Sequence, residues 1–455
     1  MKIHILGICG TFMGGVAVLA RAAGHEVSGS DANVYPPMSA QLENLGIDIH
    51  EGYDEQQLDA VPDCVVVGNA MSRGNACVEA MLNRGLRYQS GPQWLAENVL
   101  QDRWVLAVSG THGKTTTASM LAWILEDAGL NPGFLIGGIP ANFGISARFG
   151  ESPYFVVEAD EYDTAFFDKR AKFVHYRPRT LIINNIEYDH ADIYRDLDAI
   201  YWQFHQLLRT VPGDGLIVAR QADPGIDKVL AMGCWSKRQG FAAQANADWW
   251  GEFVDAEQTA IRVINPSQQS ASSSWQLNGA HNLENAVAAI AAACDVGVPF
   301  DQAVASLAGF KGVKRRLEQT ATVGTISVYD DFAHHPTAIR RTIEGIKRRD
   351  PERRLVIALE PRSNTMKMGV HNRTLAASLE DADFVHVFLP GGADDPLGEQ
   401  LRALGKAVAL HDSYEELVAA IVDGARAGDN LVFMSNGGFG ACRETVTGRL
   451  QKAAS

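Results

Sequence analysis

The chain has 455 residues, of which 46% are hydrophobic and 21% are charged, and its formal net charge is −14. That length suits about three globular domains with sizeable cores. The acidic balance argues against a general nucleic-acid surface, and no apolar run approaches the ~20 residues that cross a bilayer, so we expect neither nucleic acid nor a membrane as a partner.

Residues 1–102 are predicted to form a Rossmann-like first domain. Strands over 3–6 and 26–29 flank the turn GICGTFMGG and a helix over 16–23, which gives a β-turn-α-β unit. Glycines at such a turn let the backbone approach a diphosphate, and an acidic residue such as Asp31 after the second strand contacts a ribose or base. The unit therefore indicates a diphosphate-containing ligand.

The glycine spacing does not identify which diphosphate-containing ligand is bound. Gly7, Gly10 and Gly14 form G-x-x-G-x-x-x-G instead of the dinucleotide pattern G-x-G-x-x-G, so NAD or FAD is one alternative. The apolar start of the chain also resembles a secretory signal, although its glycines and the strand after it favour a folded unit. A strand over 64–67 ends near Asn69, which is either a turn residue or a ligand contact at the sheet edge.

The segment 103–309 opens with VLAVSGTHGKTTT, which has the features of a phosphate-binding loop. A buried strand over 106–108 leads through a glycine-containing loop into a helix. In such loops backbone N–H groups hold phosphate oxygens, while Lys114 would contact the β- and γ-phosphates and Thr115 a Mg²⁺ ion. The loop is a short variant, since Val108 stands where the general pattern begins with glycine. The alternative is a glycine-rich turn with a chance lysine.

Two later strand ends carry carboxylates and a histidine. The strand over 154–157 is followed by EADEYD, and the strand over 180–185 is followed by IEYDH. Four carboxylates within six residues repel one another unless a cation or solvent lies between them. Strands of one parallel sheet would bring Glu158 and His190 to the edge that carries Thr115, which predicts a Mg²⁺ site. A solvated acidic turn and a structural histidine are the alternatives.

Two helices downstream carry further candidates. His205 lies fifteen residues after His190, and its ring either reaches the site or packs within its helix. The sequence GAHNLEN opens an alanine-rich helix, where Asn282 either contacts a purine edge or caps the helix.

Residues 310–455 are predicted to form a third doubly wound unit. It opens with the basic cluster FKGVKRRLE, from which an arginine could reach a γ-phosphate and stabilise a phosphoryl-transfer transition state; a basic hinge is the alternative. Strands over 355–359 and 384–388 then alternate with helices. The fold class predicted for the whole chain is α/β with three doubly wound domains, namely a Rossmann-like N-terminal domain, a central P-loop ATPase-type parallel sheet and a Rossmann-like C-terminal domain.

Six motifs in this order resemble the Mur ligase family of ATP-dependent amino-acid ligases: GTHGKTTT, EADEYD, NNIEYDH, GAHNLEN, GVKRRLE and DDFAHHPT. The resemblance spans all three predicted domains. It implies that ATP activates a carboxylate as an acyl phosphate, which an amine then attacks. The turn GICGTFMGG resembles members that hold a UDP-sugar. EPRSNTMKMG and MSNGGFG are similar to members that join UDP-N-acetylmuramate to a recycled murein peptide, L-alanyl-γ-D-glutamyl-meso-diaminopimelate.

The resemblance also implies roles for the matching positions. ATP would be bound by Gly110, Thr111, His112, Gly113, Lys114, Thr115 and Thr116, with Asn282 at adenine, Arg316 at the γ-phosphate and Asp331 at the ribose. Mg²⁺ would be held by Thr115, Glu158 and His190. The catalytic set would be Lys114, Glu158, His190, His205 and Arg316, although many members have a carbamylated lysine where this chain has His205. The UDP-sugar would be bound by Gly7, Gly10, Thr11, Gly14, Asp31 and Asn69.

Further expectations concern the peptide that accepts the sugar acid and the cellular compartment of the protein. Charge and location assign the carboxylates of the peptide to Arg362, Asn364 and Lys367. His205, His334 or His335 could accept the proton of the attacking amine. Six cysteines without C-x-x-C spacing favour reduced thiols, hence a cytoplasmic protein. A ligase that adds free L-alanine to the same UDP-sugar, and a non-catalytic protein that binds nucleotide and UDP-sugar, are the rival functions.

Overall fold

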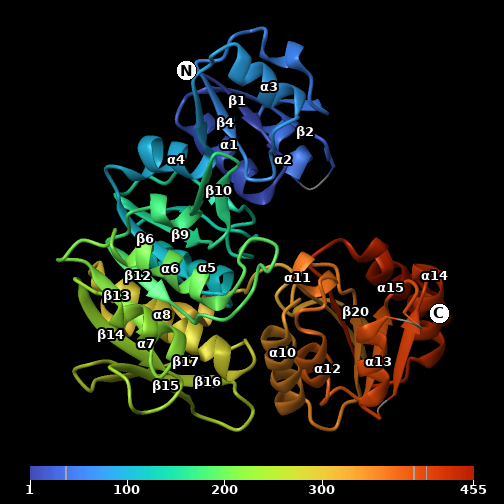
Figure 1. The fold of residues 1–455 in the computed structure, drawn as a ribbon. Helices are drawn as coiled ribbons and strands as arrows, with labels where there is room; N and C mark the ends of the chain where they lie inside the picture. Colours follow the sequence, from blue (N-terminus) through green and yellow to red (C-terminus); the bar gives the residue numbers. More distant parts are fainter. Residues whose placement is uncertain (36–37, 393–394, 406, 455) are drawn as a thin grey trace.

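Three β-sheets, one after another along the chain, organise the structure (Figure 1). The computed structural model describes residues 1–35, 38–392, 395–405 and 407–454. Each sheet is mostly parallel and carries helices, which confirms the predicted α/β class with three units. The domain limits at 102/103 and 309/310 stay predictions.

The first unit has five parallel strands in the order β3-β2-β1-β4-β5. Their bounds are β1 Lys2–Leu6, β2 Glu26–Asp31, β3 Asp48–Glu51, β4 Cys64–Val67 and β5 Tyr88–Ser90, and the helices are α1 Thr11–Ala22, α2 Met38–Asn44, α3 Ala76–Asn83 and α4 Gly91–Leu95. The chain order reverses between β1 and β4, so the turn after β1 lies at a topological switch point, where open α/β sheets bind ligands. Helix α1 begins five residues earlier than expected, directly after the glycine turn.

The central unit has a ten-stranded sheet in the order β17-β16-β15-β14-β13-β12-β6-β9-β7-β8. Its strands are β6 Trp104–Ser109, β7 Gly133–Leu135, β8 Ala147–Arg148, β9 Tyr154–Ala159, β12 Thr180–Ile183, β13 Leu216–Arg220, β14 Lys237–Ala242, β15 Trp249–Phe253, β16 Ala260–Ile264 and β17 Ser270–Ser274. The middle of the sheet is parallel as expected, but the pairs β7–β8, β15–β16 and β16–β17 at its edges are antiparallel. Strand β17 is the serine-rich SASSS with mostly exposed side chains, which suits an antiparallel edge and not a buried parallel strand.

Side chains of β6 point alternately to the two faces of the sheet, and each face has its own hydrophobic core. Leu106 and Val108 pack in one core with helices α5 (Lys114–Asp127), α8 (Ala280–Asp295) and α9 (Phe300–Ser306), whereas Val105 and Ala107 pack in another core with α6 (Leu197–Leu208) and α7 (Pro224–Ala231). A separate hairpin of β10 (Asp163–Ala165) and β11 (Asp168–Ala171) follows β9.

Helix α1 of the first unit packs against the β7–β8 edge of the central sheet. A Cβ at Gly15 would lie 2.2 Å from a methyl carbon of Leu135, so a larger residue at this position would require the Leu135 side chain to move. The contact fixes the glycine turn of the first unit relative to the phosphate loop.

The third unit has six strands in the order β18-β19-β23-β20-β21-β22, all parallel except β18. The strands are β18 Glu318–Val323, β19 Ile326–Asp331, β20 Leu355–Leu359, β21 Phe384–Phe388, β22 Val408–His411 and β23 Asn430–Met434; the helices are α10 Pro336–Arg349, α11 Asn364–Lys367, α12 Asn372–Ser378, α13 Pro396–Ala403, α14 Tyr414–Gly424 and α15 Cys442–Ala454. Helices α10, α12 and α13 share one core and α14 and α15 the other, so both faces of the sheet are covered.

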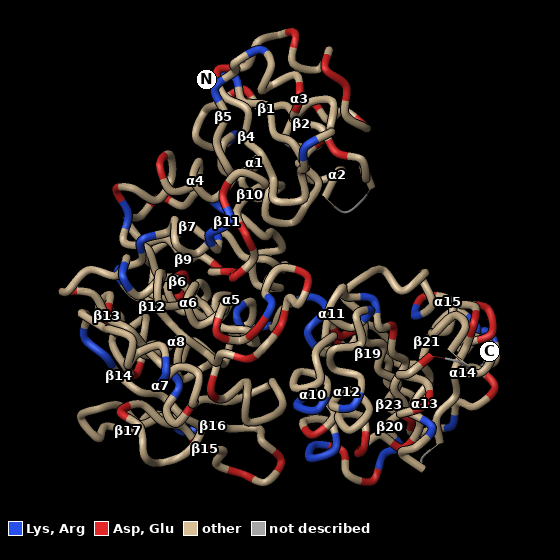
Figure 2. Tube along the Cα trace, viewed as in Figure 1, with Lys and Arg blue, Asp and Glu red and all other residues tan. Residues whose placement is uncertain are grey.

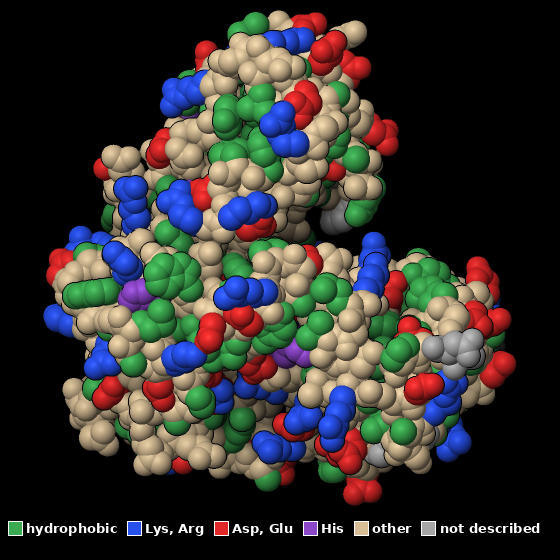
Figure 3. Space-filling model, viewed as in Figure 1, with side chains coloured by type: hydrophobic (Ala, Val, Ile, Leu, Met, Phe, Trp, Pro, Cys, Tyr) green, Lys and Arg blue, Asp and Glu red, His purple; other side chains and the backbone are tan. Residues whose placement is uncertain are grey.

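In the view of Figures 2 and 3, acidic and basic side chains are interspersed over all three units, without one continuous basic face. This agrees with the net charge of −14. Among the described residues, no helix combines the length and the apolar character that crossing a membrane requires.

Candidate active site

A single cavity is lined by residues from all three units. The first unit contributes the turn after β1 and the residues after β2 and β4; the central unit contributes the residues after β6, β9 and β12; the third unit contributes the residues after β19 and β23. Every one of these positions lies at the carboxyl end of its strand, where parallel sheets present loops to ligands. The cavity brings Thr115, Glu158 and His190 together with Gly7, Gly10, Thr11, Asp31 and Asn69.

The phosphate loop has the backbone geometry that its sequence predicts. Gly110 and Gly113 have φ angles of 129° and 82°, a region that disfavours other residues, and α5 begins at Lys114. Asn185 Oδ1 accepts a hydrogen bond from the His112 backbone N at 2.8 Å. A Cβ at Gly113 would lie 2.6 Å from Asn285 Oδ1, so the loop also needs glycine for space. The N-terminus of α5 consequently faces the cavity.

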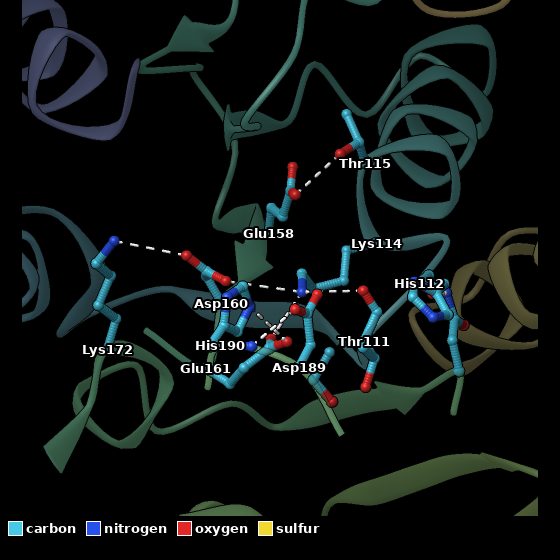
Figure 4. Close-up of polar contacts among 12 residues, drawn as sticks. Thr111, His112, Lys114, Thr115, Glu158, Asp160, Glu161, Lys172, Asp189 and His190 are labelled. Carbon is cyan, nitrogen blue, oxygen red and sulfur yellow. Dashed lines mark hydrogen bonds and ion pairs between the residues drawn. The ribbon is translucent and has the colours of Figure 1, made fainter. Parts of the chain in front are cut away.

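Lys114 forms a buried ion pair with Glu161. Its Nζ lies 2.6 Å from Glu161 Oε2, and the two side chains are 10% and 2% exposed (Figure 4). Burial alone would lower the pKa of Lys114, but Glu161 and Asp160 outweigh it and raise that pKa above its ordinary value. Burial likewise opposes ionisation of Glu161, yet Lys114 and His190 lower the pKa of its carboxyl to about 2. The ammonium that a phosphate would contact is thus held charged by a carboxylate.

Thr115 and Glu158 are in direct contact, as the proposed metal site requires. Thr115 Oγ1 donates to Glu158 Oε1 at 2.9 Å and accepts from Arg316 Nη2 at 3.0 Å. The other oxygen of Glu158 accepts from the Gly137 backbone N at 2.6 Å, and burial raises the pKa of this carboxyl. Arg316 therefore reaches the phosphate loop from the third unit, and its contact with the γ-phosphate stays a prediction.

His190 faces a different carboxylate from the one expected. Its Nε2 lies 3.3 Å from Glu161 Oε1, and its ring lies 4.0 Å from the ring of Tyr162 (centroid distance). Asp160, Glu161 and His190 each place one ligand atom within 4.8 Å of the others. Carboxylate and hydroxyl oxygens with one imidazole fit the chemistry of Mg²⁺, and the set available here is larger than Thr115, Glu158 and His190.

A second cavity adjoins the phosphate loop on the side of α8. It is lined by His112, Gly113, Thr116, Asn282, Asn285, Arg316 and Asp331, among others. Asn282 lies inside α8, and its Nδ2 donates to Asn278 O at 2.8 Å; the helix start has no side-chain cap, so the capping alternative for Asn282 is not observed. Asp331 accepts backbone N–H groups of Leu317 and Ala333, and burial raises its pKa to about 6.

In the first unit, Asp31 and Gly14 have structural contacts. Asp31 accepts from the backbone N of Cys9 and of Asn33, each at 2.9 Å, and so holds the glycine turn in shape at the cavity wall. Gly14 does not line the cavity: a Cβ there would lie 2.3 Å from Met38 Sδ, so this glycine lets α2 pack against α1. The expectation that Gly14 contacts the sugar nucleotide is corrected accordingly.

Of the two alternatives left open for His205, the structure shows the packed one, since His205 does not line this cavity. Its ring is buried about 6 Å from those of Trp202 and Trp235, and its Nδ1 has no hydrogen-bond partner among the described residues. The separation of fifteen residues between His190 and His205 does not determine the face of α6 on which His205 lies, because that face depends on how the helix packs.

The polar loop after β20 also lies elsewhere than expected. Arg362, Asn364 and Lys367 are exposed and do not line the cavity. Arg362 packs against Gly437, and Asn364 Nδ2 donates to Asp192 Oδ2 at 2.8 Å. Asn364 therefore joins the third unit to the loop that carries His190, instead of facing an open peptide site.

Several cavity residues were not in the predicted set. They include Asp160, beside which Glu161 pairs with Lys114 without lining the cavity, as well as the lining residues Lys172, Phe332 and Asn436. The acidic run EADEYD indicated that Asp160 and Glu161 could belong to a site, but the sequence does not tell which of its four carboxylates point toward the site. Lys172 was assigned no role from the sequence, because a lysine beside an aromatic residue is typical of an ordinary surface position.

Known proteins match the chain over all three units. Residues 2–103 match the Mur ligase family, catalytic domain; residues 108–293 match the Mur ligase middle domain; residues 315–437 match the Mur ligase, glutamate ligase domain. The UDP-N-acetylmuramate--L-alanyl-gamma-D-glutamyl-meso-2,6-diaminoheptandioate ligase of Escherichia coli is 50% identical over 100% of this chain and 99% of its own length.

Two further similarities bear on the acceptor. The UDP-N-acetylmuramate--L-alanine ligase of Renibacterium salmoninarum is 34% identical over 93% of this chain and 91% of its own length. The crystal structure of a murein peptide ligase from Psychrobacter arcticus superposes with a TM-score of 0.78 at 47% identity and covers 99% of both chains. Identity is thus higher to proteins named for a peptide acceptor than to the one named for free alanine.

Proposed function

This chain belongs to the Mur ligase family, and we propose that it is the ATP-dependent ligase that joins UDP-N-acetylmuramate to L-alanyl-γ-D-glutamyl-meso-diaminopimelate in peptidoglycan recycling. The observation that carries the proposal is the single cavity in which the phosphate loop, the Thr115–Glu158 pair and the glycine turn of the first unit meet. A ligase of this kind must bring a terminal phosphate and a sugar carboxylate into contact, and separate sites could not do so.

The reaction has two steps. An oxygen of the muramate carboxylate attacks the γ-phosphorus of ATP, ADP leaves, and an acyl phosphate forms; the alanine nitrogen then attacks the acyl carbon, phosphate leaves, and the nitrogen loses a proton. Lys114 and the loop N–H groups would hold the phosphates, and Arg316 would neutralise charge on the transferred group. Thr115, Glu158 and His190 would hold Mg²⁺, which supplies further charge neutralisation.

His334 is the best placed candidate to accept the proton of the amine. Its Nδ1 contacts Phe332 O at 2.9 Å, and because a carbonyl only accepts, Nδ1 carries the hydrogen and Nε2 has a free lone pair. Burial lowers the pKa of His334 to about 4, so the ring is neutral at pH 7. His335 is less suitable, since both its nitrogens have backbone partners, Tyr188 O and the Thr337 N.

The proposal divides the substrates among the units. Residues 1–102 bind the UDP-sugar, 103–309 bind ATP, and 310–455 bind the peptide, with Arg362 and Lys367, which are exposed and outside the cavity, as candidate cations for its carboxylates. The adenosine would lie in the cavity at Asn282. Six cysteines, all free, suit a reducing compartment, so we place the reaction in the cytoplasm.

The acceptor assay tests the proposal. Purified protein is incubated with Mg²⁺, ATP and UDP-N-acetylmuramate, and phosphate release is followed with the tripeptide, with free L-alanine and without acceptor. Release that depends on the tripeptide is expected, and it should stop when EDTA removes the metal. Release with alanine alone would favour the alanine ligase, whereas binding of both nucleotides without turnover would favour the non-catalytic alternative.

A further inference from the structure

Lys172 is a buried lysine whose ammonium is incompletely partnered. It follows the β10–β11 hairpin, its side chain is only 8% exposed, and it lines the cavity (Figure 4). Its Nζ lies 3.5 Å from Asp160 Oδ2 and makes no hydrogen bond to any described residue. Buried charges are normally both paired and hydrogen-bonded, so this ammonium has unused donors that face a ligand cavity.

The surroundings of Lys172 come from two units. Its Nζ lies 5.2 Å from the ring centroid of Phe12, in the first turn of α1, and 5.3 Å from that of Tyr162, which follows β9. Aromatic faces stabilise a cation without hydrogen bonds. Lys172 therefore lies where the glycine turn of the first unit adjoins the acidic segment of the central unit.

The one carboxylate beside Lys172 is shared. Asp160 Oδ1 lies 3.6 Å from Lys114 Nζ, while its Oδ2 faces Lys172. Asp160 and Glu161 together balance the charges of the two lysines, but Asp160 divides its two oxygens between them, and both of these contacts are longer than the 2.6 Å pair of Lys114 with Glu161. Lys172 is thus compensated in charge by a long contact, but its ammonium keeps hydrogen-bond donors that no described residue uses.

We propose that Lys172 binds an oxyanion of the sugar nucleotide, which is either its diphosphate or its lactyl carboxylate. The inference rests on the proposed function, because that function supplies the ligand. Both anions belong to the molecule that must span the distance from the glycine turn to Lys114, and Lys172 lies between these two sites. Lys172 is in this sense a substrate-binding residue that adds to the glycine turn.

The test measures binding of UDP-N-acetylmuramate without ATP by calorimetry, for the wild type, Lys172→Met and Lys172→Arg. Methionine keeps the apolar stem but removes the charge. We expect the Met variant to bind roughly tenfold or more weakly and the Arg variant to recover most of the affinity. Lys169→Met is the matched control, because Lys169 is an exposed lysine on β11 that pairs with Asp163. The affinity of this variant for UDP-N-acetylmuramate should equal that of the wild type.

UDP-N-acetylglucosamine, which has the diphosphate but no lactyl carboxylate, separates the two anions. If Lys172 contacts the diphosphate, the Met variant loses affinity for both sugar nucleotides by the same factor. If it contacts the carboxylate, only UDP-N-acetylmuramate binding weakens. Either result supports the proposal and names the anion.

Equal affinity of the wild type and Lys172→Met for UDP-N-acetylmuramate would overturn the inference and leave the ligase function intact. Binding of ATP to each variant is measured in parallel. A variant that weakens ATP binding as much as sugar-nucleotide binding would show that Lys172 acts through Asp160 and Lys114, which also overturns it. A wild type that binds no UDP-N-acetylmuramate would contradict the proposed function itself.

Discussion

Thr365 of the third unit contacts Asp189 of the central unit, with 3.1 Å between the Thr365 hydroxyl and Asp189 Oδ1. The same hydroxyl accepts from the backbone N of Ala191 at 3.3 Å, so it bridges the two residues that flank His190. His190 has a φ of 55°, a left-handed conformation that is costly for a residue other than glycine. The contact therefore helps to hold a candidate metal ligand in a strained backbone and links it to the third unit.

Replacing Thr365 by valine should lower kcat by roughly tenfold, because the isosteric side chain cannot bridge Asp189 and Ala191. The Mg²⁺ concentration for half-maximal activity should rise in the same variant. Thr365→Ser should retain near wild-type values, and Thr374→Val on α12, whose hydroxyl contacts only His371 O, is the control. An unchanged Mg²⁺ requirement in Thr365→Val would show that the bridge does not position His190.

Lys114→Met should abolish ligation and also destabilise the fold, because it leaves Glu161 buried without its ammonium partner. Removing one member of a buried pair costs about 3–5 kcal/mol. Adding Glu161→Gln should restore much of the thermal stability but none of the ligation. Differential scanning calorimetry and the phosphate-release assay measure the two effects. Full ligation in Lys114→Met would refute the phosphate-binding role.

Arg316→Lys should reduce kcat on the order of 100-fold, with a much smaller change in the KM for ATP. Lysine keeps the charge but not the planar fork that reaches Thr115 Oγ1 and lies over the Phe332 ring, 5.0 Å from its centroid. Steady-state kinetics of this variant are compared with those of Arg340→Lys, at an exposed position of α10. Equal kcat values in the two variants would place Arg316 outside the phosphoryl-transfer step.

Acid should destabilise the third unit through His386. This ring is buried, its Nδ1 lies 3.0 Å from His411 Nε2, and burial followed by repulsion from His411 lowers its pKa to about 4. Because the folded pKa lies below the unfolded value near 6.5, its contribution to stability is complete above pH 6.5 and is lost as the pH falls towards 4.

Between pH 7.5 and pH 5, the free energy of unfolding should fall by about 2 kcal/mol more in the wild type than in His386→Gln. Urea unfolding at the two pH values measures this difference directly. Equal pH dependence in both proteins would mean that His386 is not the responsible group, since the other buried histidines are present in each.

The sequence by itself determined the features that depend on a few consecutive residues. Gly110 and Gly113 have the positive φ angles of a phosphate loop, and Lys114 starts the helix that follows, because these properties are local to the backbone. Buried apolar runs such as Cys64–Val67 became parallel strands with the expected bounds for the same reason. The class of fold and the strand ends that carry the site could be predicted at this level.

Only the tertiary structure decided which side chains meet. Glu161, and not Glu158, pairs with Lys114 and His190, because the turn after β9 sets the direction of each carboxylate. His205 packs near two tryptophans, since the face of α6 depends on its packing partners. Contacts such as Lys114 with Glu161 and His205 with Trp235 join residues far apart in the chain, and their geometry follows from how sheets and helices pack, which no local pattern contains.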